Sequence, residues 1–251
     1  MSLTSFHMFH RNDPIVIVLY ALTMLSVSCE KDPEPLTTNS VITGYVYLDD
    51  PDFESPTGFE VVASGPYGQK SASISNDQFV ITGLGNGNYY LDYSRDNYGS
   101  VRQYGIQLFG NDTAHAEYVQ LYKKPSPNFV MPEFIRASVV DNEGYESRKI
   151  IRIETNYSTY ETYWPVRLFM HVSKEVSCSE YMESYPTMAN YVNELYIEPS
   201  WLHFSSGTEV FVIGYSCNPR DNGYLDTYKN ELIFSTLDKN KHSNVVSFIM
   251  P

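Results

Sequence analysis

Cysteine is scarce in this chain. Its 251 residues include only three, Cys29, Cys178 and Cys217. No two of them have the Cys-x-x-Cys spacing of a zinc ribbon or a dithiol redox site. The sequence therefore excludes a disulfide-rich scaffold and a cysteine-based metal centre as the basis of the fold.

Basic residues are also few. The chain carries 17 Lys and Arg against 30 Asp and Glu, which gives a formal net charge of −13. Nucleic-acid binding needs basic surface that neutralises phosphates, so we expect no nucleic-acid partner. An anionic membrane surface is an unfavourable electrostatic partner for the same reason.

The N-terminal hydrophobic run is too short to span a membrane. Ile15–Leu25 is a run of 11 residues, interrupted only by Tyr20 and Thr23, whereas a transmembrane helix needs about 20. Its length and the small residues Ser26–Ser28 that follow are typical of a secretory signal peptide. We therefore predict that residues 1–28 are a cleaved signal peptide.

The residues that end this run resemble a bacterial lipoprotein signal. In Leu25–Cys29 the small Ser28 precedes the cysteine, although the leucine lies four positions before it rather than three. The acidic stretch Cys29–Pro35 resembles the surface-export signal of Bacteroidetes lipoproteins. The resemblance implies that Cys29 carries acyl chains such as palmitate and anchors the protein to the outer face of the outer membrane. The alternative is a plain signal peptide with a coincidental cysteine.

Sequence motifs of catalysis are missing. The chain has no HExxH, GxSxG, P-loop or GxGxxG pattern, and no pair of acids is marked out for acid–base chemistry. The histidines downstream of the signal stand singly along the sequence, at His115, His171, His203 and His242. We therefore expect no enzyme, no metal site and no cofactor.

What is present is a long series of β-type runs. After a flexible tether, residues 29–39, runs alternate with turn signals over residues 40–122 at a spacing of roughly 8–12 residues, as in a β-sandwich. The runs include Ser40–Leu48, Phe59–Gly65, Gln78–Leu84 and Asn88–Ser94. Asn86-Gly87 between the last two predicts a β-hairpin, because both residues tolerate positive φ.

Glycines and tyrosines in this segment resemble the carboxypeptidase-regulatory-like, transthyretin-like domain. Gly44-Tyr45-Val46 matches its opening Gly-x-Val strand, and Gly83, Leu84, Gly87 and Tyr89 match its later Gly-Leu-x-x-Gly-x-Tyr motif. The turn at Asp77-Gln78-Phe79 lacks the glycine of the family. The resemblance implies a seven-stranded Greek-key sandwich that is usually an accessory module.

A proline-containing linker, residues 123–128, separates this segment from a second series of β-type runs at residues 129–251. In Trp164–Val172 apolar residues alternate with Arg167, Phe169 and His171, which predicts a strand with one apolar and one mixed face. The closing strands, Gly207–Ser216 and Ser243–Pro251, resemble those of an immunoglobulin or fibronectin type III-like domain. The predicted fold is thus all-β, with two tandem sandwiches. Between the closing strands, the long loop that starts at Cys217–Gly223 is a candidate for function.

Few residues stand out as candidate sites. In an oxidising compartment Cys178 and Cys217 could form a disulfide, or they could remain two separate buried thiols. Asp112-Thr113-Ala114 matches a bacterial O-glycosylation signal at Thr113. Four aromatic residues could stack on a ligand or belong to the core: Tyr160, Tyr163, Trp164 and Trp201.

These features predict a non-catalytic, lipid-anchored module on the cell surface that binds a glycan or a protein partner. The alternative is a pilus or adhesion subunit that resembles the fimbrillins, which are lipoproteins that assemble by strand donation after cleavage at a basic residue. The sequence has no arginine for such cleavage after the first strand, and Lys123-Lys124 lies between the domains instead.

The lipid anchor is directly testable. Cys29→Ala removes the thiol to which the acyl chains would attach, so we expect loss of labelling by a palmitate analogue and release from the membrane fraction. A variant that stays labelled and membrane-bound would contradict the assignment.

Overall fold

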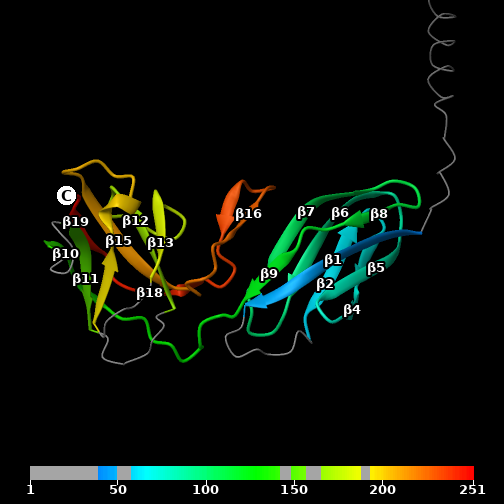
Figure 1. The fold of residues 1–251 in the computed structure, drawn as a ribbon, viewed down its shortest axis with the longest axis horizontal. Coiled ribbons are helices and arrows are strands. Elements are labelled where there is room, and N and C mark those ends of the chain that lie inside the picture. Colours follow the sequence, from blue (N-terminus) through cyan, green and yellow to red (C-terminus); the bar gives the residue numbers. More distant parts are fainter. Residues whose placement is uncertain (1–38, 50–57, 142–147, 157–164, 188–192) are drawn as a thin grey trace, which may run out of the picture. The chain divides into compact units, whose positions relative to one another are not determined.

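The computed structural model describes residues 39–49, 58–141, 148–156, 165–187 and 193–251. These residues form strands and a single 3-10 turn, η1 (Pro199–Trp201), so the predicted all-β fold is confirmed (Figure 1). None of the described segments is a helix long and apolar enough to cross a membrane. The predicted signal peptide and Cys29 lie outside the described residues.

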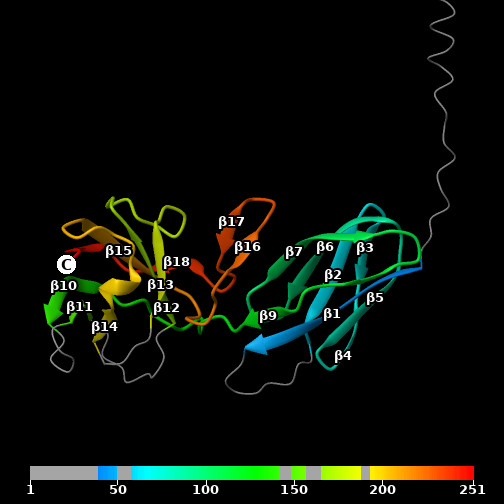
Figure 2. The same ribbon diagram turned by 45° about the horizontal axis from the view of Figure 1, so that its top comes forward.

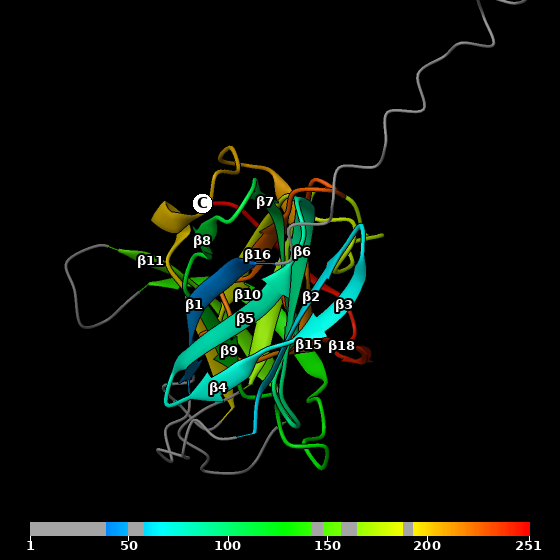
Figure 3. The same ribbon diagram turned by 90° about the vertical axis from the view of Figure 1, so that its right-hand side faces the viewer.

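Residues 40–122 form a first sandwich of two sheets. One sheet has the order β4-β5-β1-β8, with β9 also paired to β1, and the other has the order β3-β2-β6-β7. Figure 3 shows β1, β5 and β4 side by side in the first of these sheets. The strands are β1 (Ser40–Asp49), β2 (Glu60–Gly65), β3 (Gly68–Ser71), β4 (Ser73–Ser75), β5 (Gln78–Leu84), β6 (Gly87–Ser94), β7 (Val101–Leu108), β8 (Thr113–His115) and β9 (Val119–Tyr122). The described part thus has nine strands, where the family resemblance implied seven.

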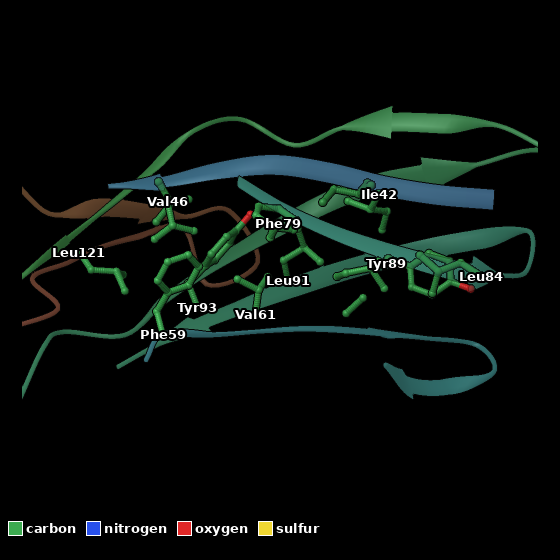
Figure 4. Close-up of a cluster of buried hydrophobic side chains, with 14 of the residues drawn as sticks. Ile42, Val46, Phe59, Val61, Phe79, Leu84, Tyr89, Leu91, Tyr93 and Leu121 are labelled. Atoms are coloured by element: carbon green, nitrogen blue, oxygen red, sulfur yellow. The ribbon is translucent and has the colours of Figure 1, made fainter. Parts of the chain in front are cut away.

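Alternating side chains of both sheets form the core of the first sandwich. Every second residue of β1, β2, β5 and β6 points between the sheets and is buried, as the period of a strand requires. Figure 4 shows these side chains meeting between the layers, with the Phe79 and Tyr93 rings close together. The two rings meet edge to face, with centroids 5.7 Å apart.

The connection between β5 and β6 is not the predicted hairpin. The two strands are consecutive but pair with different partners, β5 with β1 and β4, and β6 with β2 and β7. The chain crosses from one sheet to the other because Phe79 and Ile81 of β5 and Tyr89 and Leu91 of β6 all face the same core from opposite sides. The Tyr89 hydroxyl closes this crossing by donating to the Gly85 carbonyl at 3.0 Å.

Residues 129–250 form a second sandwich around a separate core. A sheet of order β10-β11-β14 faces a sheet of order β13-β12-β15-β18, in which β19 also pairs with β15. Pro165 directly precedes β12, as its fixed φ allows at a strand start. The strands are β10 (Phe134–Asp141), β11 (Lys149–Thr155), β12 (Val166–His171), β13 (Glu183–Pro186), β14 (Glu194–Ile197), β15 (Glu209–Ser216), β18 (Asp238–His242) and β19 (Val246–Ile249).

Strand β12 is buried on both faces. Val166, Leu168 and Met170 point into the core of the second sandwich, as their alternation predicts. The other face, predicted to be mixed, is covered as well. Phe169 lies at the centre of an aromatic cluster, with edge-to-face contacts at centroid distances of 4.9 Å to Tyr181, 5.5 Å to Tyr215 and 5.6 Å to Phe234.

One of the residues that cover this outer face, Phe234, is next to a small hairpin. The hairpin consists of two strands, β16 (Tyr224–Asp226) and β17 (Glu231–Ile233) (Figure 2). Phe234 directly follows β17 and belongs to the aromatic cluster around Phe169. The hairpin is therefore fixed at its base by apolar packing. Its strands pair only with each other among the described residues.

The first sandwich requires glycine at position 44. Gly44 lies opposite Phe79 in the β1–β5 register, and a Cβ atom there would stand 2.7 Å from two carbons of the Phe79 ring. The ring is fully buried against Tyr93 and has no room to withdraw. We expect Gly44→Ala to lower the free energy of unfolding by about 1–3 kcal/mol, measured by urea denaturation.

A double-mutant cycle identifies the cause of this loss. Phe79→Leu alone leaves a cavity, but in combination with Gly44→Ala the smaller side chain makes room for the new methyl group. The double variant should therefore lose less than the sum of the two single losses. Additive losses would show that the Phe79 ring is not what requires glycine at position 44.

Candidate functional site

A hollow of about 540 Å³ lies beside the edge of the first sandwich and the β16–β17 hairpin. We call it the tyrosine groove, because four of its lining residues are tyrosines, Tyr104, Tyr118, Tyr122 and Tyr224. Its volume is within the range of small-molecule and cofactor sites. The lining consists of residues 101–104 of β7, residues 117–120 and Tyr122 in and before β9, and Asp221, Gly223, Tyr224, Leu225, Thr227 and Ser235.

Aromatic rings and one guanidinium form a continuous column next to the groove. The Tyr104 ring lies 6.0 Å from Tyr90 and 6.0 Å from Tyr228, and its plane is nearly parallel to that of Tyr228. The Arg102 guanidinium sits over Tyr90, 4.4 Å from the ring centroid. These contacts link β6 and β7 to the hairpin, since Tyr228 belongs to the loop that joins β16 and β17.

A β-bulge sets the position of Tyr104. Tyr89 pairs with Ile106 and Leu91 with Gln103, so Tyr104 and Gly105 together face the single residue Tyr90. Gly105 has a φ of 80°, a conformation that costs other residues roughly 1–2 kcal/mol. Bulges at sheet edges re-aim side chains and increase the local twist. Here the bulge turns β7 where its aromatic side chain meets the groove.

Asp226 shapes the tip of the hairpin. Its Oδ1 accepts hydrogen bonds from the backbone N–H groups of Tyr228, at 3.1 Å, and Lys229, at 3.0 Å. Asn230 completes the loop with a φ of 55°, which asparagine tolerates better than most residues. Tyr228 is thereby held in place although 84% of its surface is exposed.

The base of the hairpin depends on one buried carboxylate. Asp221 is 1% exposed. Its Oδ1 accepts from the Gly223 N–H at 3.0 Å, and its Oδ2 accepts from the Ser235 hydroxyl at 3.1 Å. The Thr236 N–H and hydroxyl also donate to Oδ2, at 2.8 and 2.9 Å. The three hydrogen bonds from Ser235 and Thr236 tie the segment before β16 to the segment after β17.

Arg167 contacts the backbone of the same loop. Its side chain is 3% exposed, and one guanidinium nitrogen donates to the Asp221 carbonyl. The guanidinium also lies 4.3 Å from the centroid of the Phe234 ring. A buried cation thus contacts the backbone of the loop and the ring that anchors the hairpin.

Two groove tyrosines are held as neutral hydrogen-bonding groups. Burial raises the pKa of Tyr122, and the nearby Asp221 and Asp49 raise it further. Burial likewise raises the pKa of Tyr224, with a further rise from Asp226, while a hydrogen bond from the Arg102 backbone partly offsets these effects. Both phenols therefore stay protonated and can donate at physiological pH.

Of the four predicted stacking aromatics the structure describes Trp201, which does not line this groove. Trp201 is 53% exposed in η1, with its ring stacked on Tyr185 at a centroid distance of 5.6 Å. Tyr160, Tyr163 and Trp164 lie outside the described residues. The predicted glycosylation residue Thr113 is exposed in β8, next to β1.

The cysteine pair does not form the disulfide considered from the sequence. Cys178 and Cys217 are both free thiols that belong to the same apolar cluster. Cys178 lies against Tyr215, whereas the Cys217 sulfur lies 3.4 Å from the Thr236 hydroxyl. Burial raises the pKa of Cys217 to about 11. The thiolate needed for disulfide exchange is therefore disfavoured.

The four histidines downstream of the predicted signal lie on different elements or loops of the structure. Within the described ranges no three His, Cys, Asp or Glu side chains are grouped to hold a metal ion. His203 pairs with Glu183 at 2.9 Å, while His242 packs against the Tyr215 ring. The single positions of the histidines in the sequence thus correspond to separate places in the structure.

The sequence pointed to one part of the groove lining, Asp221 and Gly223 in the loop that starts at Cys217, and missed the rest. Residues 101–108 and 224–226 were not recognised as strands, so Tyr104 and Tyr224 had no predicted place in the fold. The signal that could have directed attention to them is local. Tyr104-Gly105 has a glycine at the bulge, and Asp226-Thr227-Tyr228 begins with a turn-forming aspartate.

This chain has matches among solved structures. No family model matches it, and no curated protein matches it. Among solved structures, it is similar to a chain of a cohesin–X-dockerin complex from Acetivibrio cellulolyticus, with 16% identity and a TM-score of 0.27. That match covers 34% of this chain and 58% of the other, so the chain spans little more than half of that relative.

Other similar structures cover more of the chain. A "putative carbohydrate binding protein" from Bacteroides uniformis shares 9% identity over 84% of this chain and 99% of its own, with a TM-score of 0.27. The major pilin subunit of Bacillus cereus shares 11% identity over 84% of this chain and 69% of its own, with a TM-score of 0.28. Scores this low lend no weight to a functional argument.

The buried carboxylate of Asp221 yields a stability prediction. Asp221→Asn keeps the size of the side chain but replaces an acceptor oxygen by an NH₂ group that faces donors. We expect the free energy of unfolding to fall by about 2–3 kcal/mol, measured by urea denaturation. Asp238→Asn is the control, because Asp238 accepts one hydrogen bond from an exposed backbone N–H, and should cost about 1 kcal/mol or less. Equal losses in both variants would contradict the role given to Asp221.

Proposed function

We propose that the mature protein is a non-catalytic, lipid-anchored module of the outer cell surface that binds a carbohydrate chain in the tyrosine groove. The observation that carries the proposal is the composition of the groove. Four tyrosines lie among amide, carboxylate and hydroxyl side chains along one hollow. Aromatic faces stack on the apolar faces of sugar rings, while amides and phenols can meet sugar hydroxyls with either donors or acceptors.

The arrangement of the groove supports binding by preformed surfaces. Tyr104 is held between Tyr90 and Tyr228, and Tyr118 contacts Tyr47 with ring centroids 6.2 Å apart. Rings that are already packed lose little side-chain entropy when a ligand binds. Tyr118 nevertheless keeps 73% of its surface exposed and is available to a ligand.

A pilus subunit fits the chain less well. Strand β1 lies inside its sheet, paired with β5 on one side and with β8 and β9 on the other. The sequence has no Lys or Arg between Lys31 and Lys70. Cleavage after a basic residue downstream of β1 would therefore remove β2 as well, which contributes Val61 and Ala63 to the core. We propose the binding module over the pilin for this reason.

Affinity electrophoresis of the mature protein tests the proposal. Native gels cast with soluble starch, arabinoxylan, galactomannan or mixed-linkage β-glucan should retard the protein in at least one case. Tyr118→Ala removes an exposed stacking face, and Tyr104→Ala removes the ring that holds Tyr90 and Tyr228 next to the groove, so each should weaken that binding by about tenfold. The loss is read as the glycan concentration required for half-maximal retardation.

A matched variant separates the groove from exposed tyrosines in general. Tyr67 is 57% exposed in the turn between β2 and β3 and does not line the groove. Tyr67→Ala should bind as the unaltered protein does. Binding that is lost equally in all three variants would argue against the groove as the site. The proposed function fails if neither these neutral glycans nor a second panel of anionic glycans retards the protein.

A further inference from the structure

The cation in the wall of the tyrosine groove is already engaged. Arg102 is the single Lys or Arg among the described residues that line it. Its Nε and Nη2 donate to the two carboxylate oxygens of Asp92, at 2.5 and 2.8 Å. This two-pronged ion pair raises the pKa of Arg102 above its already high ordinary value, with the hydrogen bond to Asp92 as the largest cause. The guanidinium is therefore always charged, and its charge is matched by that of Asp92.

The position of Arg102 also limits its freedom to meet a ligand. The guanidinium packs over the Tyr90 ring at 4.4 Å and lies 6.0 Å from the Tyr104 ring centroid. To bind a carboxylate or sulfate in the groove, it would have to exchange the Asp92 carboxylate for that of the ligand. Such an exchange replaces one pair of charged hydrogen bonds with another and yields little net affinity.

The remaining charges of the groove are negative. Glu117 is an exposed wall residue, and Asp221 contributes a buried carboxylate at the floor. Because the charge of Arg102 is offset by that of Asp92, the net charge of the groove is negative. The formal net charge of the whole protein, −13, has the same sign. An anionic ligand would thus be repelled both at long range and in the groove.

The uncharged groups suit a ligand that has hydroxyls and no charge. The side-chain amides of Gln103 and Gln120 can each donate and accept, as a sugar hydroxyl does. The shape of the groove matches a linear ligand. Four consecutive residues of β7, 101–104, and four before and in β9, 117–120, line it, so each wall runs for about 10 Å at the rise of a strand.

We infer that the tyrosine groove selects an uncharged, linear carbohydrate chain and rejects uronate-containing and sulfated chains. This inference rests on the proposed function, since it names the class of carbohydrate that the same site would take. The Arg102–Asp92 pair is the specificity determinant. It keeps a cation in the wall for packing against tyrosine while withholding that cation from anionic ligands.

The test compares neutral and anionic glycans under the same conditions. Affinity electrophoresis of the mature protein uses the neutral panel above alongside polygalacturonate, alginate and chondroitin sulfate. We expect retardation by at least one neutral glycan and by none of the anionic ones. Retardation by anionic glycans alone, lost in Tyr104→Ala, would overturn the inference and leave the groove as a carbohydrate site. Absence of retardation in both panels would overturn the proposed function itself.

A gain-of-binding variant tests the role of the ion pair. Asp92→Asn releases the Arg102 fork, and we expect this variant to be retarded by polygalacturonate, which does not retard the unaltered protein. Asp96→Asn makes the same charge change at an exposed position outside the groove and should give no such gain. A gain of equal size in both variants would show that net charge, and not the Arg102–Asp92 pair, excludes anionic chains.

Discussion

The hydrogen bonds to the buried carboxylate of Asp221 are the interaction on which the tyrosine groove depends. The hairpin β16–β17 is too short to be stable alone, because an isolated two-stranded ribbon is marginal in water. Four hydrogen bonds to one buried carboxylate close its base, and the Arg167 guanidinium satisfies the carbonyl of the same residue. A buried charge is tolerated only when it is well bonded. In the loop from Cys217 to Gly223, Asp221 is turned inward, whereas Arg220 and Asn222 are exposed.

The hairpin in turn completes the groove. It presents Tyr224 and Tyr228 toward β7. There the bulge at Gly105 redirects the strand, and the Tyr104 ring stacks on the Tyr228 ring. The two sandwiches provide the rigid frame, since their cores hold β7 through β6, and Phe234 through Phe169. The groove tyrosines Tyr104 and Tyr224 therefore lie at a bulge and in a hairpin, while the regular strands support them.

The sequence was sufficient for features that depend on alternation. The alternation in Trp164–Val172 identified β12 and the face that packs into the second core, and the turn-rich spacing identified an all-β fold. It was insufficient where one pattern fits two topologies. Asn86-Gly87 suits a hairpin, but β5 and β6 both place large side chains toward one core, and this forces them into opposite sheets. In β12 the alternation revealed one apolar face, while the cover over Phe169 comes from residues remote in sequence.

Most of the tyrosine groove could not be recognised from the sequence for related reasons. Arg102 and Tyr104 occur in a glycine-containing, polar stretch that lacks a clear period, because an edge strand with a bulge has few buried positions. The loop from Cys217 to Gly223 was recognised as a candidate for function from its length alone. The partners of Asp221 come from both ends of the hairpin, and no spacing rule in the sequence connects them.

Hydrogen exchange measured by mass spectrometry, with and without a saturating neutral glycan, tests the central claim most directly. If the tyrosine groove binds the chain, amides in residues 101–104, 117–120 and 223–227 should exchange more slowly in the presence of the glycan, and those near Trp201 and Tyr185 should be unchanged. Protection confined to the Trp201 region, with none along β7 and β16, would contradict the account.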